Sequence, residues 1–254
     1  MLFSEIVYGP IHSRRLGTSL GINLMPTTQK ICSFNCVYCE CGFNQPVNGK
    51  IQLPTVKQFS LALENKLQQL QTSKIDVITF SGNGEPTMHP KFSEIIDETI
   101  ILRNLYAPEA KISVLSNSTQ LYKREVVNAL WKADNRILKL DSAITPTMQL
   151  IDDPADKHIT PETIIRYLKQ FDGDFILQTC FLKGQWKGQT IDNTTTEELN
   201  AWYKAVRLLQ PKELMIYVID RATPVKTLEK IAPETMQQIA EPLIKEGFKV
   251  IISA

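Results

Sequence analysis

The sequence predicts an α/β fold with a parallel sheet, and three observations carry this prediction. The 254-residue chain is 43% apolar and 22% charged, which is typical of a globular protein that buries a sizeable core. Short, continuous apolar runs recur along it, as expected of strands that are buried on both faces. Segments with helical periodicity separate these runs, so that a β-α pattern repeats roughly six times.

The apolar runs are the predicted strands. Each has four to seven residues and is rich in Val, Ile, Leu and Phe. The runs cover residues 19–24, 75–80, 111–115, 137–141, 174–180, 213–219 and 249–252.

The segments between the runs carry helix-start signals. Pro54 and Thr55 precede a helical apolar repeat, and Thr160 followed by Pro161 predicts an N-cap with proline at the first helical position. The repeat consists of Val56, Phe59, Leu63, Leu67 and Leu70.

Two later helices have similar signals. Thr195 with Glu198 three residues on predicts a capping box. Residues 232–234 open a last helix that is expected to end near Gly247.

Parallel strands with crossover helices leave two architectures, an open doubly wound sheet or a closed or partly closed barrel. Periodicity does not choose between them. Both place function in the loops that leave the carboxyl ends of the strands.

Charge and hydropathy exclude several classes of protein. With 28 Lys and Arg against 27 Asp and Glu the formal charge is +1, so no strong field gathers nucleic acid or anionic membrane. The first ten residues lack a basic leader with an apolar core, and no 18 apolar residues run together. We therefore expect a cytoplasmic protein without membrane association.

Cysteine usage directs attention to one loop. Of five cysteines, four lie between Cys32 and Cys41, which favours a metal site or reactive thiols over a disulfide framework. Cys32, Cys36 and Cys39 form C-x3-C-x2-C, a spacing that directs three thiolates at one inorganic centre and leaves one iron of a cubane cluster without a protein ligand. The alternatives are a zinc site completed by Cys41 and uncoordinated redox thiols. Otherwise Cys41 is a bystander, and Cys180 is expected to be a packed core thiol.

With Tyr38 directly before its last cysteine, this loop resembles the signature of the radical S-adenosylmethionine (radical SAM) superfamily. The resemblance implies a partial (β/α)6-type barrel and a [4Fe-4S] cluster on Cys32, Cys36 and Cys39. It also implies that SAM binds the open iron and is cleaved reductively to methionine and a 5′-deoxyadenosyl radical, which abstracts hydrogen from a substrate. A low-potential electron donor of flavodoxin or ferredoxin type is expected as a partner.

The residues that follow the second predicted strand support this resemblance. Glycines there let a ligand approach the backbone, and a carboxylate there accepts from an ammonium group, although the stretch also reads as an ordinary glycine turn. The family has a Gly-Gly-Glu element that receives the amino group of SAM. Gly82, Gly84 and Glu85 match it, with Asn83 as a departure between the glycines.

Other strand ends supply further candidates. Ser116 and Asn117 suit ribose hydroxyls, whereas Ser118 or Thr119 is explained as an N-cap of a helix beginning near Leu121. The further candidates are Tyr38 beside the adenine and Asp141, Gln178 and Asp220 for cofactor or substrate contacts.

One branch of the superfamily, uncharacterised iron-sulfur oxidoreductases grouped with the wyosine-base synthases, is resembled by four segments together. They are residues 8–17, the cysteine loop, residues 82–87 and residues 138–141. No cysteine precedes Cys32 to bind the second cluster of those synthases. Arg14 and Arg15 either clamp an anion or line a solvated edge.

The expected domain is single, over residues 1–254, with a lead-in at 1–17, a core at about 18–220 and a β/α extension at about 221–254. The substrate stays open among an RNA base, a protein and a small metabolite. The alternative function is a non-catalytic zinc or iron-sulfur binding module.

Overall fold

The computed structural model describes residues 2–13, 16–46, 49, 51–70 and 74–253. Its contacts divide the chain into two compact units. Unit 1 comprises Met1–Cys32, Asn44–Ser116 and Gln120–Arg136, and unit 2 comprises Ser33–Phe43, Asn117–Thr119 and Ile137–Ala254. The expectation of a single domain stays a prediction. Arg14 and Arg15 lie outside the described residues.

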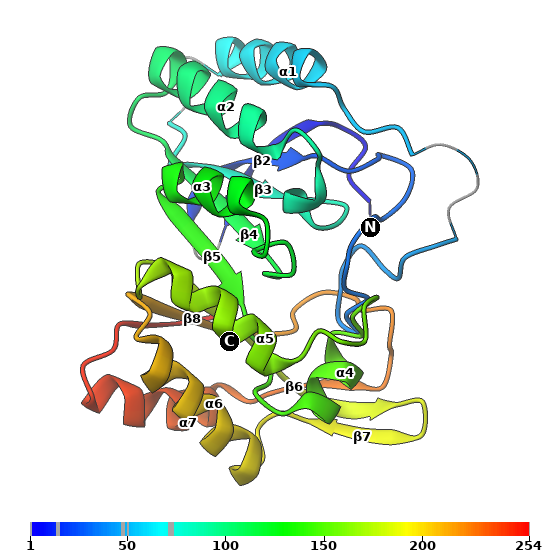
Figure 1. Ribbon diagram of the computed structural model, residues 1–254, viewed down its shortest axis with the longest axis vertical. Coiled ribbons are helices and arrows are strands. Elements are labelled where there is room, and N and C mark those ends of the chain that lie inside the picture. Colours follow the sequence, from blue (N-terminus) through cyan, green and yellow to red (C-terminus); the bar gives the residue numbers. More distant parts are fainter. Residues whose placement is uncertain (1, 14–15, 47–48, 50, 71–73, 254) are drawn as a thin grey trace. The chain divides into compact units, whose positions relative to one another are not determined.

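Unit 1 contains parallel strands and the helices that follow them (Figure 1). Strand β2 pairs in parallel with β3, and β3 with β4. Helix α1 packs against α2, and α2 against α3. The elements are β1 (Val7–Ser13), β2 (Gly17–Asn23), α1 (Val56–Gln69), β3 (Val77–Ser81), α2 (Phe92–Tyr106), β4 (Lys111–Ser116) and α3 (Arg124–Lys132).

Unit 2 repeats the pattern after β5 (Asn135–Lys139), the strand within which the unit boundary falls. Strand β6 pairs in parallel with β5 and with β8, and β8 pairs in parallel with β10. The elements are α4 (Thr145–Ile151), α5 (Pro161–Leu168), β6 (Ile176–Trp186), β7 (Gln189–Asp192), α6 (Thr196–Leu209), β8 (Glu213–Val218), β9 (Leu228–Lys230), α7 (Pro233–Lys245) and β10 (Val250–Ser253).

The seven predicted strands are present, and most of them are continuous runs of apolar side chains that the core encloses, whereas β10 is only half-buried over most of its length. Leu20, Ile78, Leu138, Leu177 and Ile216 all have 0% exposure. The predicted α/β class with parallel strands and crossover helices is therefore confirmed.

Strand β1, which precedes the predicted strands, pairs antiparallel with β2. Two predictions of local structure are wrong. The helix expected near Leu121 begins at Arg124, with Lys123 as N-cap and no side-chain cap bond, so Ser118 and Thr119 do not cap it. The Thr195 hydroxyl accepts from the N–H of Glu198, but the Glu198 carboxylate accepts from Ser142 at 2.7 Å. The capping box is thus only half formed.

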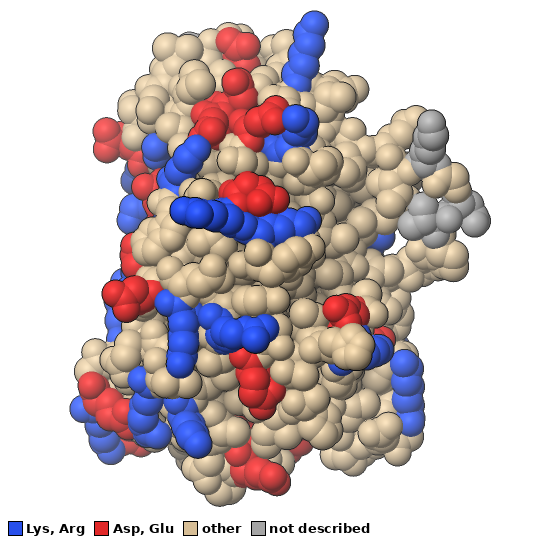
Figure 2. All heavy atoms as spheres, viewed as in Figure 1, with Lys and Arg blue, Asp and Glu red and all other residues tan. Residues whose placement is uncertain are grey.

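Charged side chains of both signs are intermingled on the face seen in Figure 2. Many of them form exposed ion pairs, such as Lys132 with Asp97 at 2.6 Å and Arg207 with Glu246 at 2.7 Å. Within the described residues, no helix combines the length and the apolar character that crossing a membrane would require.

Candidate functional site

The predicted site residues are divided between the two units, and each group has its own surroundings. Unit 1 contains Cys32, Gly82, Gly84, Glu85 and Ser116. Unit 2 contains Cys36, Tyr38, Cys39, Asn117, Asp141, Gln178 and Asp220.

In unit 1, the backbone directly ahead of Cys32 pairs with the loop that follows β3. The N–H of Ile31 donates to the carbonyl of Asn83 at 2.9 Å, and the N–H of Glu85 donates to the carbonyl of Ile31 at 3.1 Å. Gly84 lies opposite Ile31 with φ +147°, and a Cβ on it would come within 1.7 Å of the Ile31 carbonyl oxygen. This close approach requires glycine at position 84.

The departure from the family pattern at Asn83 has a structural role. Its side chain is completely buried, and its Nδ2 donates to the carbonyls of Phe3 and Pro26, both at 2.8 Å. Its Oδ1 accepts from the N–H of Phe3 at 2.8 Å. The asparagine therefore binds both the N-terminal segment and the start of the loop that follows β2. Gly82, with φ +113°, lies against Asn23, whose Oδ1 accepts from the N–H of Asn83 at 3.0 Å.

Glu85 is held in one orientation. It is only 3% exposed and is the N-cap of a short 3-10 helix over Pro86–Met88. Its Oε1 accepts from the N–H of Thr87 at 3.1 Å, from the hydroxyl of Thr87 and from the hydroxyl of Ser116 at 2.9 Å. Ser116, predicted to face ribose, thus donates to the Glu85 carboxylate.

Asn44 holds the backbone of Cys32 from the far side of the cysteine loop. Its Nδ2 donates to the Cys32 carbonyl at 3.0 Å, and its Oδ1 accepts from the Cys32 N–H at 3.2 Å. A two-bond clamp of this kind fixes the direction in which the Cys32 side chain leaves the main chain.

In unit 2, the rest of the cysteine loop is bound to the end of α4. The N–H groups of Asn35 and Val37 donate to the carbonyls of Asp152 at 2.8 Å and Ile151 at 2.9 Å. The last carbonyls of a helix have no partner within the helix, so the loop satisfies them. A tight turn follows, in which the N–H of Cys39 donates to the Cys36 carbonyl at 3.1 Å. Cys36 and Cys39 therefore leave a single fixed turn.

A buried ionic group surrounds Cys36. The ammonium of Lys139 lies 3.1 Å from the Cys36 sulfur, 3.2 Å from Asp141 Oδ2 and 3.1 Å from Asp152 Oδ1. The Cys36 thiol donates to Asp152 Oδ1 at 3.4 Å, and the Tyr38 hydroxyl donates to Asp141. We call Cys36, Tyr38, Lys139, Asp141 and Asp152 the Lys139 cluster.

Burial and proximity shift the pKa values in this cluster. Burial lowers the pKa of Lys139, but Asp141 and Asp152 outweigh it and hold that pKa well above its ordinary value. Burial raises the pKa of Asp152 to about 7, against the opposing charge of Lys139. Burial, and then Asp141, raise the pKa of Tyr38 well above its ordinary value. Lys139 is thus a permanent cation among acidic groups.

The remaining candidates have varied surroundings. Asn117 is buried, donates to the Ser33 hydroxyl at 2.9 Å and accepts from the hydroxyl of Thr119 at 2.8 Å, so it helps to hold the cysteine loop. Gln178 is buried with its amide 3.7 Å from the sulfur of Met215, and Asp220 lies 3.8 Å from Lys230.

Cys180 is completely buried, as predicted, and its N–H donates to Asp141 Oδ1 at 2.9 Å. Cys41 is half-buried. Among the described residues, no three His, Cys, Asp or Glu side chains gather closely enough to share one metal ion.

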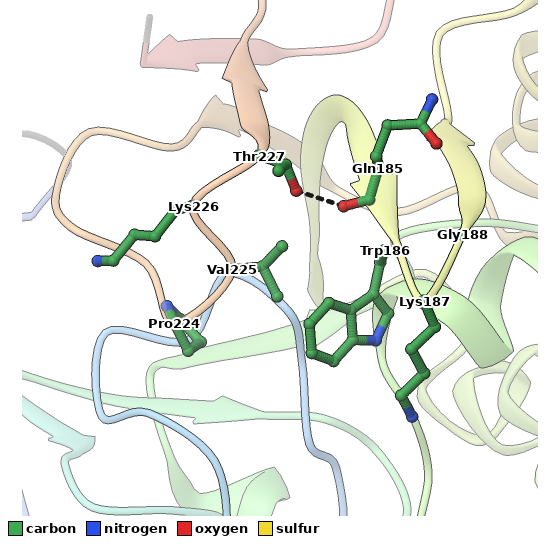
Figure 3. A pocket seen from close by; sticks show the side chains of 8 residues that line it. All are labelled: Gln185, Trp186, Lys187, Gly188, Pro224, Val225, Lys226 and Thr227. Atoms are coloured by element: carbon green, nitrogen blue, oxygen red, sulfur yellow. Dashed lines mark hydrogen bonds between the residues drawn. The ribbon is translucent and has the colours of Figure 1, made fainter.

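A separate pocket of about 320 Å³ lies at the β6–β7 hairpin (Figure 3). Residues 185–188 line one side, and residues 224–227 line the other. Trp186, which lines it, stacks on Phe43 with ring centroids 5.4 Å apart. The pocket contains none of the predicted site residues.

Sequence reasoning missed Lys139 and Asp152 as functional candidates. Lys139 is a charged residue within a predicted strand of apolar residues, two positions before Asp141. Residues two positions apart in a strand share one face, and this spacing could have indicated that Lys139 and Asp141 lie together. Asp152 follows the last residue of α4, and no pattern in the sequence marks it as a partner of Lys139.

The chain matches the sequence pattern of the Radical SAM superfamily over residues 27–166, which include the three cysteines, Glu85 and the Lys139 cluster. It belongs to this superfamily of enzymes. Among curated proteins it is similar to a UPF0026 protein of Helicobacter pylori, with 34% identity over 70% of this chain. The match spans 57% of the length of that relative.

Two solved structures share the fold. The crystal structure of Streptococcus suis SuiB bound to S-adenosylmethionine has a TM-score of 0.64 at 13% identity, over 89% of this chain and 49% of that one. A structure of TYW1 with a lysine-pyruvate adduct bound has a TM-score of 0.61 at 13% identity, over 91% of this chain and 74% of that one. The predicted membership of the radical SAM superfamily and the partial-barrel fold are confirmed.

Proposed function

We propose that this radical SAM enzyme holds a [4Fe-4S] cluster through Cys32, Cys36 and Cys39 and binds SAM at the iron without a protein ligand. The observation that carries the proposal is the C-x3-C-x2-C spacing in a loop whose backbone is fixed. In unit 1 the loop that follows β3 and Asn44 hold its start, and in unit 2 the end of α4 holds Asn35 and Val37. Fixed thiols lose little entropy when they bind a metal centre.

The donor set fits an iron-sulfur cluster. Thiolates are the ligands that such clusters prefer, and the ammonium of Lys139 lies 3.1 Å from the Cys36 sulfur. When bound, the cluster supplies the electron that cleaves SAM to methionine and a 5′-deoxyadenosyl radical, which abstracts hydrogen from the substrate.

The protein residues around the cofactor bind and orient it. Glu85 accepts a hydrogen bond from the amino group of SAM. The hydrogen bonds that Thr87 and Ser116 donate to Glu85 fix its carboxylate. A hydroxyl that donates one bond still accepts others, so Ser116 remains available to ribose together with Asn117. Gly82, Gly84, Tyr38 and Asp141 contribute to the cofactor side. Gln178 and Asp220 are proposed for the substrate side.

The partners follow from this chemistry. A low-potential flavodoxin or ferredoxin reduces the cluster, and the substrate is an RNA base, a protein or a small metabolite in the cytoplasm. The wyosine-synthase resemblance favours RNA, whereas the formal charge of +1 disfavours non-specific RNA binding.

Anaerobic reconstitution tests the proposal. We expect about four irons and four sulfides per chain and release of 5′-deoxyadenosine that depends on dithionite. Cys36→Ala removes one of the three ligands and should lose both, while Cys41→Ala should keep both. One tightly bound zinc and no cleavage of SAM would instead identify a non-catalytic binding module.

A further inference from the structure

The ammonium of Lys139 is bound by three acceptors at once. They are the Cys36 sulfur at 3.1 Å, Asp141 Oδ2 at 3.2 Å and Asp152 Oδ1 at 3.1 Å. An ammonium has three N–H donors, so each acceptor receives one. The side chain of Lys139 is 12% exposed, and those of Asp141 and Asp152 are 0% and 2% exposed. The donor to the sulfur is therefore shielded from bulk water.

The two carboxylates fix this donor in place. Asp141 is held in turn by the N–H of Cys180 at 2.9 Å and by the hydroxyl of Tyr38. Asp152 is the C-cap of α4, and its carbonyl binds the cysteine loop at Asn35. The ring of Tyr38 lies 4.6 Å from the ammonium and covers another side of it. Lys139 is thus more strongly constrained than a surface lysine.

Without Lys139, a Cys36 thiolate would face Asp152 at 3.4 Å with no cation between them. Two like charges at such a distance in a buried site repel strongly. The cation makes a thiolate at Cys36 compatible with the carboxylates around it.

We propose that Lys139 is a positioning residue that donates a hydrogen bond to the Cys36 sulfur of the bound cluster and raises the reduction potential of that cluster. The inference rests on the proposed function, because it requires Cys36 to be a cluster ligand. Hydrogen bonds to the sulfurs and nearby charge set the potentials of iron-sulfur clusters. A cation stabilises the reduced cluster, which carries one more negative charge. Asp141 and Asp152 serve to hold the cation.

Redox titration followed by electron paramagnetic resonance tests the effect on the potential. In reconstituted Lys139→Met we expect the midpoint potential to become more negative by at least about 59 mV, which is a tenfold change in a one-electron equilibrium. Lys139→Arg keeps a cation with hydrogen-bond donors and should change the midpoint potential less. Lys132→Met, a change at an exposed lysine of α3 paired with Asp97, should leave it unchanged.

A second measurement does not depend on the folding of Lys139→Met. Protein labelled with ¹⁵N at the lysine side chains should show weak ¹⁵N hyperfine coupling to the reduced cluster in electron-nuclear double resonance. Lys139→Arg replaces the labelled nitrogen while it preserves the charge, so the coupling should disappear. Lys132→Met should retain it.

The outcomes separate this inference from the proposed function. If wild-type protein does not assemble a cluster of about four irons, the proposed function fails. If the cluster assembles but the ¹⁵N coupling is absent from wild type or persists in Lys139→Arg, the role of Lys139 is refuted and the cluster assignment stands. An unchanged midpoint potential in a cluster-loaded Lys139→Met would refute it equally.

Discussion

The carboxylate of Glu85 is oriented by the protein before any ligand binds it, because Thr87 and Ser116 donate to the same oxygen. Glu85→Gln keeps that acceptor and removes the charge. We expect the dissociation constant for SAM to rise roughly ten- to a hundredfold, since a hydrogen bond to a charged group contributes about 1.5–3 kcal/mol. Calorimetric titration of the reconstituted protein measures it.

The matched control for Glu85→Gln is Glu94→Gln. Glu94 is an exposed residue of α2 that pairs with Lys91 at 2.7 Å. Its substitution should leave SAM binding as in wild type. Equal affinity of Glu85→Gln and Glu94→Gln would remove Glu85 from the binding site.

Gly84→Ala would drive a methyl group into the carbonyl of Ile31, 1.7 Å away. We expect it to be less stable than Gly247→Ala, where φ is +93° but nothing lies within 4 Å of the added carbon. Both positions have a positive φ that disfavours a Cβ, and Gly84→Ala adds the clash with Ile31. Urea denaturation of the metal-free variants measures it, and equal losses of stability would contradict the close approach.

The candidate site could be predicted only where the residues that act together are close in sequence. Cys32, Cys36 and Cys39 form one motif, and Glu85 follows its own glycines. The pairing of Lys139 with Asp152 depends on how α4 follows β5, and no local pattern encodes that packing. The same holds for Asn83, whose partners at Phe3 and Pro26 are 80 and 57 residues away.

At the level of elements, the capping box at the N-terminus of α1 is a local sequence pattern that stabilises the helix. The Thr55 hydroxyl accepts from the N–H of Gln58 at 3.2 Å, and the Gln58 side chain accepts from the N–H of Thr55 at 2.9 Å. Thr55→Ala should cost about 1 kcal/mol of unfolding free energy, while Thr55→Ser keeps the acceptor and costs less. Chemical denaturation checks this order, and the reverse order would exclude capping as the cause.

His89 connects the residue before the N-cap of α1 with the turn before α2, and the stability that its hydrogen bonds provide should depend on pH. His89 is buried, its Nδ1 accepts from the N–H of Lys91 at 3.1 Å, and its Nε2 donates to the Pro54 carbonyl at 2.9 Å. Burial lowers the pKa of His89, although the bond to Pro54 opposes this effect. The folded state therefore binds the proton less readily than the unfolded state does.

The sign of the pH dependence follows from linkage. The stability that comes from neutral His89 is fully present above the unfolded pKa of about 6.5 and is lost as the pH falls toward the lowered pKa of the folded state. His89→Gln should flatten this part of the curve. Urea midpoints measured between about pH 5 and 8 test it, and parallel curves for the two proteins would contradict it.

The strands that sequence reasoning missed are those whose burial is not continuous. Strand β1 has mostly half-buried and exposed side chains, so it lacks the apolar run by which the other strands were recognised. Strand β6 continues past its predicted end at 180 to Trp186, where exposed and half-buried residues alternate in the hairpin with β7. Continuous apolar runs predict strands, including the half-buried β10, whereas strands without such a run need the tertiary structure.

For the molecule as a whole, the formal charge of +1 and the paired surface charges predict weak non-specific binding to RNA. Fluorescence anisotropy with an arbitrary single-stranded RNA should show affinity only at low salt, with a shallow dependence on salt concentration. A steep dependence with tight binding at physiological salt would instead indicate a basic surface and favour an RNA substrate.

The pair of hydrogen bonds between Phe3 and Asn83 has a practical consequence for anyone who purifies the protein. Removal of the first few residues would leave the Asn83 amide without these partners next to the glycine loop that carries Glu85. Trimming or crowding this end would loosen a loop 80 positions away and produce the same loss of cofactor binding as a change in the loop itself. Affinity tags are better attached elsewhere. N-terminal truncations should be checked for loss of SAM affinity before such a loss is attributed to a residue of the loop.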